Sequence, residues 1–164
     1  MNRILIVVVI AALAAVANGR EAASFADVPP CHWAAEAVTE LADTGVFIGF
    51  PPDDAYLSVN ALRQVFEGVR CDDPSWTLRF VVDAPADLGQ AAVPRLLGFE
   101  LDATVLQRTP AQIELGYALT VHLEHHGTRT TATREGTMPV HRSDLGWRLD
   151  YADLAALDLP LFPR

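Results

Sequence analysis

The segment from residue 112 to residue 124 has a side-chain pattern with a period of two. Every second position is apolar: Ile113, Leu115, Tyr117, Leu119, Val121 and Leu123. The positions between them include Glu114, Thr120, His122 and Glu124. A period of two places successive side chains on opposite faces of a β-strand. The segment therefore predicts a long strand with one buried and one wet face, and such a strand requires a sheet with a core on one side.

The residues around this strand predict an antiparallel sheet. His126-Gly127 is a two-residue sequence of the kind that closes β-hairpins. Folding back across it sets Glu124 opposite Arg129, a favourable cross-strand charge pair. We expect further strands at 99–107, 129–141 and 147–151, a strand-like run at 76–83, and a short helix within 84–97. Together they predict a sheet domain over residues 76–159.

The preceding residues predict two helices. One spans about 32–43, with Glu36 and Glu40 outward and an inward stripe of Trp33, Ala37, Val38 and Leu41. The second has a stripe at helical spacing, Leu62, Val65, Phe66 and Val69, and Ser58 or Asn60 is its expected N-cap. Asp53 and Asp54 are interpreted as solvated turn carboxylates, because a calcium site needs more oxygen ligands.

A turn-rich run at residues 71–75 predicts the boundary between a helical module at 24–71 and the sheet domain. The predicted fold class is therefore α+β, a small helical module followed by a small domain with a curved antiparallel sheet.

The first residues have the plan of a secretory signal peptide. Met1-Asn2-Arg3 precedes an apolar run over 4–17 that ends in Ala15-Val16-Ala17. The run is shorter than the roughly 20 apolar residues of a spanning helix. We therefore expect residues 1–17 to be removed, no stable membrane span, and a location in the periplasm, the cell wall or the cell surface.

The chain contains two cysteines, Cys31 and Cys71, which bracket the two predicted helices. In an exported chain such a pair predicts a disulfide. Closing this loop stabilises a fold by about 4 kcal/mol in the chain-entropy account. The alternatives are two free buried thiols, or a metal site that would need further ligands.

Residues 24–71 resemble the S-layer homology module, a cell-wall-attachment domain. The resemblance rests on F-x-D-V, H-W-A and G-hydrophobic-x-G-aromatic-P patterns, carried here by Phe25, Asp27, Val28, His32, Trp33, Ala34, Ala37, Val38, Leu41, Gly45, Val46, Gly49, Phe50 and Pro51. The family's T-R-A-E-F motif corresponds to Leu62-Arg63-Gln64-Val65-Phe66, which keeps the arginine and the phenylalanine.

The resemblance implies binding of wall polymer or of another envelope protein through Asp27, Trp33 and Arg63. The alternative for Trp33 is a core indole. A lone module either binds weakly or gains affinity by self-association, because linked copies raise the effective concentration.

Residues 85–157 are similar in pattern to the nuclear-transport-factor-two-like cone fold, whose members enclose small ligands or serve as non-catalytic accessory domains. Isomerase members imply an acid/base pair, for which this chain offers Asp102, Tyr117, Asp150 and Tyr151.

The spacing of His122, Glu124 and His126 is compatible with a transition-metal site, but a wet strand face carries such residues in any case. The chain has no serine-nucleophile elbow. Its net charge of −9 argues against nucleic acid.

The sequence therefore predicts an exported, non-catalytic envelope protein without a cofactor or metal, docking to wall polysaccharide or an envelope protein. The alternative is a periplasmic small-ligand-binding protein or enzyme that uses a cone pocket.

Overall fold

The computed structural model describes residues 28, 31, 34–43, 53–86, 88 and 93–163. The chain divides into two compact units, one of residues 1–28 and 32–49 and the other of residues 29–31 and 50–164. The predicted leader at 1–17, Asp27 and Trp33 lie outside the described residues. Among the described residues, no helix has the length and apolar character needed to cross a bilayer.

In the first unit the structure describes helix α2, Ala35–Asp43. The helix ends at Asp43, as predicted. Near its start, the Val38 amide donates to the Ala34 carbonyl over 2.9 Å. Glu36 and Glu40 are exposed as predicted, whereas Ala37, predicted to face inward, is exposed.

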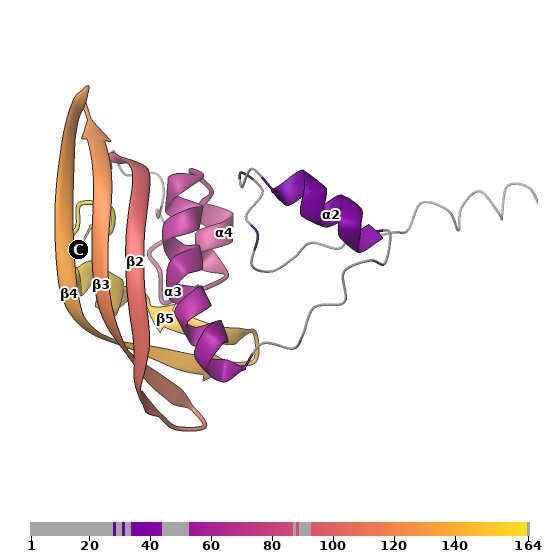
Figure 1. Cartoon of the computed structure of the whole chain (residues 1–164). Coiled ribbons are helices and arrows are strands. Elements are labelled where there is room, and N and C mark those ends of the chain that lie inside the picture. Colours follow the sequence, from indigo (N-terminus) through magenta and orange to yellow (C-terminus); the bar gives the residue numbers. More distant parts are fainter. Residues whose placement is uncertain are drawn as a thin grey trace, which may run out of the picture. The chain divides into compact units, whose positions relative to one another are not determined.

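The second unit is an α+β fold around a five-stranded sheet (Figure 1). Its elements are α3 (Asp54–Arg70), α4 (Pro74–Leu78), β1 (Val81–Val82), β2 (Arg95–Arg108), β3 (Gln112–His125), β4 (Thr128–Ser143), β5 (Gly146–Asp150) and α5 (Tyr151–Ala156). The strand order is β1-β5-β4-β3-β2, and the pairs are antiparallel except β1 with β5. The predicted α+β class is confirmed.

The alternating segment forms β3 with the predicted register. Glu124 lies opposite Arg129, and their side chains form an ion pair at 3.8 Å. His126 and Gly127 both have positive φ, 50° and 77°, as a two-residue hairpin turn requires. On the other side of β3, strand β2 carries two bulges, at Leu97 and Leu106, where one extra residue enters the ladder.

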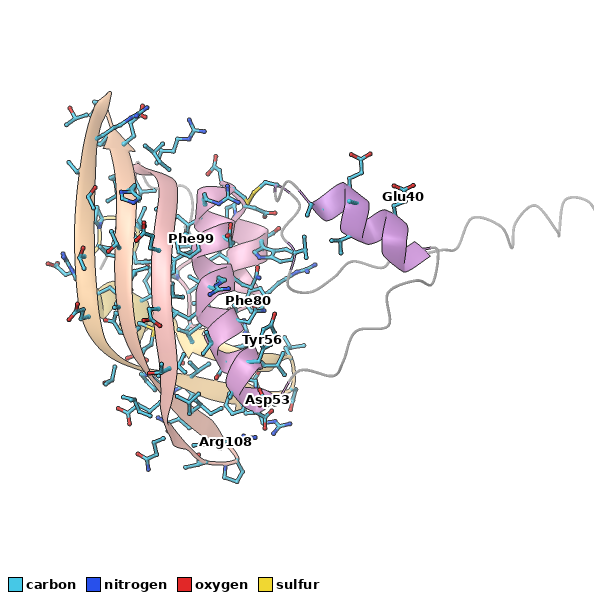
Figure 2. All side chains as sticks on the ribbon, in the orientation of Figure 1. Glu40, Asp53, Tyr56, Phe80, Phe99 and Arg108 are labelled. Atoms are coloured by element: carbon cyan, nitrogen blue, oxygen red, sulfur yellow. A yellow bond between two sulfur atoms is a disulfide. The ribbon has the colours of Figure 1, made fainter. Side chains whose placement is uncertain are left out.

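The core lies on the face of the sheet that bears the apolar residues of β3, which we call the inner face. Helix α3 covers it with its apolar stripe, and the carboxy-terminal segment after α5 adds Leu159, Leu161 and Phe162. The Phe66 ring lies 5.6 Å from that of Phe99 on β2 and 5.7 Å from that of Phe162, between centroids. Figure 2 shows Phe99 on the side of β2 that faces α3. One core thus joins α3 to the sheet, so α3 and the sheet belong to one compact unit. The boundary predicted at residues 71–75 would have separated them.

Helix α3 begins earlier than predicted. Asp53 is its N-cap, and a carboxylate oxygen of Asp53 accepts from the Tyr56 amide over 2.8 Å. Ser58, a predicted cap, is buried within the helix and donates to the Ala55 carbonyl. The first aspartate of the pair is therefore a cap, and Leu62 and Arg63 lie in the middle of the helix.

The strand-like run predicted at 76–83 is wrong for its first half. Asp73 caps α4, its carboxylate accepting from the Trp76 amide over 3.0 Å, and Pro74 occupies the first turn, where a missing N–H costs nothing. Val81 and Val82 alone form β1, beside β5.

Candidate functional site

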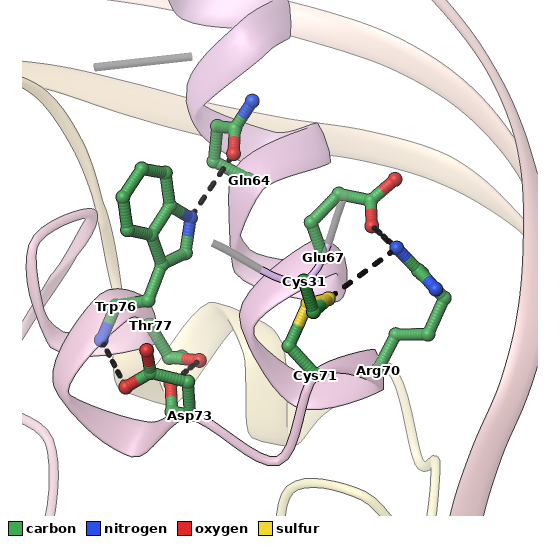
Figure 3. The surroundings of a disulfide bond; sticks show 8 residues. All are labelled: Cys31, Gln64, Glu67, Arg70, Cys71, Asp73, Trp76 and Thr77. Atoms are coloured by element: carbon green, nitrogen blue, oxygen red, sulfur yellow. Dashed lines mark hydrogen bonds and ion pairs between the residues drawn. A yellow bond between two sulfur atoms is a disulfide. The ribbon is translucent and has the colours of Figure 1, made fainter. Parts of the chain in front are cut away.

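A disulfide joins Cys31 to Cys71, the C-cap residue of α3, as predicted (Figure 3). It ties the residue that precedes the α2 segment to the carboxyl end of α3. Arg70 lies beside it: one guanidinium nitrogen is 3.6 Å from Cys31 Sγ and 2.8 Å from a carboxylate oxygen of Glu67. The bridge therefore holds Cys31 at the carboxyl end of α3.

Arg63 is exposed on α3 and makes no hydrogen bond or ion pair with any described residue. It belongs to a polar stripe that alternates steps of four and three residues along one side of the helix: Tyr56, Asn60, Arg63, Glu67 and Arg70. Tyr56 at its amino end is 52 % exposed (Figure 2). Arg63 was predicted from the sequence as a binding residue and Tyr56 was not, although the spacing of seven residues between them places both on one side of a helix.

A cavity of about 500 Å³ lies at the carboxyl end of α3. Its apolar lining comes from α3, the segment before β2, β2 itself and the chain's last residues: Val69, Leu88, Val93, Leu96 and Leu161.

Most polar groups at its wall are already bonded within the protein. The Tyr151 hydroxyl donates to the Pro163 carbonyl over 2.8 Å, and Asp73 accepts from Ser75 and Trp76. These hydrogen bonds hold the pKa of Asp73 below its usual value, and the one from the Ser75 hydroxyl has the largest effect. The cavity is therefore mainly an apolar surface, with exposed Asp72 and Arg95 at its rim.

Asp54, in the first turn of α3, joins three elements electrostatically. Its carboxylate accepts from Trp147 Nε1 over 3.1 Å and from Arg108 over 2.8 Å, and it lies 3.6 Å from Arg142. The Trp147 hydrogen bond and the two arginines lower the pKa of Asp54. The prediction that Asp54 is a solvated turn carboxylate is therefore wrong, because the helix begins at this residue and faces the ends of β2, β4 and β5.

The four acid/base candidates do not form one pocket wall. Asp102 is exposed on β2 and Tyr117 lies on β3 against Gly136, whereas Tyr151 begins α5. Burial raises the pKa of Tyr117, opposed by the charge of Arg134. Arg134 is already hydrogen-bonded within the protein, since it donates to the carbonyls of Leu157 and Asp158 beyond α5.

The metal ligands considered from the sequence are not brought together in the described structure. His122 Nδ1 lies 3.1 Å from the Thr131 hydroxyl, and the His126 ring lies tilted beside that of His125 at the hairpin turn, 4.1 Å away between centroids. A different group gathers instead, composed of His141, Asp150 and Asp153. Burial, together with the charge of Asp150, raises the pKa of Asp153, and His141 opposes that shift.

Comparison of the chain with protein-family models and with curated proteins finds no match.

Proposed function

We propose that this protein is an exported, non-catalytic envelope protein that docks to an anionic cell-wall polymer, or to an envelope protein, through the S-layer-homology-like segment and α3. The observation that carries the proposal is the exposed guanidinium of Arg63, without a partner among the described residues, on the same helical stripe as the exposed ring of Tyr56.

The chemistry of this stripe suits a charged polysaccharide. A guanidinium binds phosphate or carboxylate through two parallel hydrogen bonds. An aromatic ring offers an apolar face with a polar tip, which matches the mixed surface of a sugar. Arg70 does not compete for the same ligand, because Glu67 already pairs with it.

Two further features support the proposal. A disulfide is typical of proteins that leave the reducing cytosol. The inner face of the sheet is filled by α3 and by the carboxy-terminal segment, and this favours an interaction module over a cone-type pocket.

The test is co-sedimentation of the full chain, produced by export, with purified cell walls. Arg63→Ala is expected to weaken binding by about tenfold or more, because a hydrogen bond to a charged group contributes about 1.5–3 kcal/mol. Arg129→Ala is the matched control, since it removes the same charge from an exposed arginine on the β4 hairpin. Equal binding by the Arg63 and Arg129 variants, or no binding above that of an unrelated acidic protein, would contradict wall docking.

The cavity supports a second candidate, the binding of a small apolar ligand. Its volume of about 500 Å³ falls in the range of ligand sites. Val69→Trp narrows it, so a ligand held there would lose affinity while wall binding would be unchanged. A solvent-sensitive apolar dye distinguishes the two candidates. The measurement is whether the dye binds to the wild type and whether Val69→Trp weakens that binding.

A further inference from the structure

Three side chains of the kinds that can bind a metal ion meet on the outer face of the sheet, opposite the core. They are His141 near the end of β4, Asp150 at the end of β5, and Asp153 in the first turn of α5. One donor atom from each lies within 4.8 Å of the other two, and His141 Nε2 is 3.5 Å from Asp150 Oδ2.

The backbone dictates this meeting. His141 pairs with Arg148 in the β4–β5 ladder, so Asp150, two residues further along β5, lies diagonally beside it on the same face. Asp153 follows Asp150 by three residues, close to one helical turn. The three side chains thus come from a strand, a strand end and a helix that are all fixed by the core beneath them.

Among the residues that the structure describes, neither carboxylate lies within ion-pair distance of an arginine. Asp150 is the N-cap of α5, yet its side chain accepts no hydrogen bond from that helix. Arg148 is turned away, since its Nη2 donates to the carbonyls of Leu78 and Val81. Within the described part of the chain, Asp150 and Asp153 form no ion pair with an arginine, so His141 is the partner of this group.

We propose that His141, Asp150 and Asp153 bind a divalent transition-metal ion of the zinc type. One imidazole nitrogen and two carboxylate oxygens suit zinc, whereas calcium and magnesium prefer oxygen ligands alone. Three protein ligands leave a coordination position for water. The half-exposed side chains, 39 % for His141 and 41 % for Asp150, give an ion a path from solvent.

The experiment uses the full chain without a histidine tag, stripped of metal by a chelator and titrated with zinc in a calorimeter. We expect one ion per chain and a zinc-dependent rise in melting temperature. His141→Gln and Asp153→Asn are expected to weaken binding by more than tenfold, the lower end of what loss of even an outer-shell partner costs. Asp150→Asn should do the same, and it removes no capping hydrogen bond, because the Asp150 side chain accepts none from α5.

Two histidine controls match the first variant. His122→Gln changes another outer-face histidine, and the double change His125→Gln with His126→Gln removes the pair at the hairpin turn. Both are expected to bind zinc as the wild type does. Absence of zinc binding by the wild type, unchanged binding by His141→Gln, or loss of binding in the hairpin double variant would each overturn the site. Circular dichroism of the zinc-free variants confirms that a loss is not unfolding.

Discussion

A buried polar pair marks the contact between α3 and α4. Trp76 Nε1 donates to Gln64 Oε1 over 3.0 Å, and both residues are almost fully buried. Gly68 lies beside them, where an added Cβ would come within 2.9 Å of the Thr77 backbone nitrogen. The two helices can therefore pack this closely only with glycine at position 68 and with a hydrogen-bond acceptor facing the indole.

The first prediction concerns this acceptor. Gln64→Leu leaves the indole N–H buried without a partner, and is expected to lower the free energy of unfolding by about 1–3 kcal/mol. Urea unfolding of the purified chain measures the change.

A double-mutant cycle with Trp76→Phe provides the control. The double variant should cost less than the sum of the two single changes, because both remove one shared interaction. Additive costs would show that the hydrogen bond contributes nothing.

Sequence reasoning found neither of these residues as partners. Gln64 was visible only as a departure from a family motif, and Trp76 was placed in a strand. The two residues meet because the chain reverses at Asp72, whose φ is 55°. A non-glycine residue in that conformation is uncommon, so the sequence does not predict it.

At the scale of elements, a bulge in β2 decides where Arg108 points. Strict alternation from Val105, which faces the core, would place residue 108 on the outer face. The extra residue at Leu106 shifts the pattern, so that Arg108 pairs with inner-face Ile113 and reaches Asp54. The hairpin of β2 and β3 is thereby joined to the start of α3.

The second prediction follows from the lowered pKa of Asp54. A carboxylate with a lower pKa in the folded state stabilises the fold above its unfolded pKa, and this contribution is lost as the pH falls through the folded value. Asp54→Asn should therefore lower stability at neutral pH, and the difference from wild type should shrink as the pH falls below 3.8.

Denaturant unfolding across this pH range provides the measurement. Asp144→Asn, an exposed change of the same charge in the β4–β5 turn, should show no such dependence. A pH-independent effect of Asp54→Asn would assign its role to shape rather than charge.

Elements with a strong local pattern were predictable, and those set by distant contacts were not. The alternation of β3 and the His126-Gly127 turn required only neighbouring residues, and both are confirmed. The helix α4 was missed because Asp73-Pro74 serves equally as a turn and as a helix start. The His141, Asp150 and Asp153 group depends on ladder register across β4 and β5, which single-sequence periodicity does not give.

At the scale of the whole molecule, the disulfide spans 40 residues of sequence and ends on the helix that covers the core. Reduction frees Cys31 from α3 without removing any core side chain. Reduction mainly raises the conformational entropy of the unfolded chain, because the closed loop restricts its conformations.

The third prediction is that Cys31→Ser combined with Cys71→Ser lowers the unfolding free energy by about 2–4 kcal/mol, within the usual range for a disulfide. Calorimetric melting of oxidised wild type, reduced wild type and the double variant provides the measurement. The last two should melt together, and a variant as stable as the oxidised protein would show that the bridge does not support the fold.

The edge strand β2 has a consequence for crowded conditions. Strand β2 has one neighbour among the described strands, so its far side presents main-chain groups to which a strand of another molecule can add. The bulges at Leu97 and Leu106 interrupt and bend that edge, so a straight strand from another molecule would lose its hydrogen-bond register at both places. The same irregularity that brings Arg108 to α3 thus discourages edge-to-edge pairing between the sheets of two copies at high concentration.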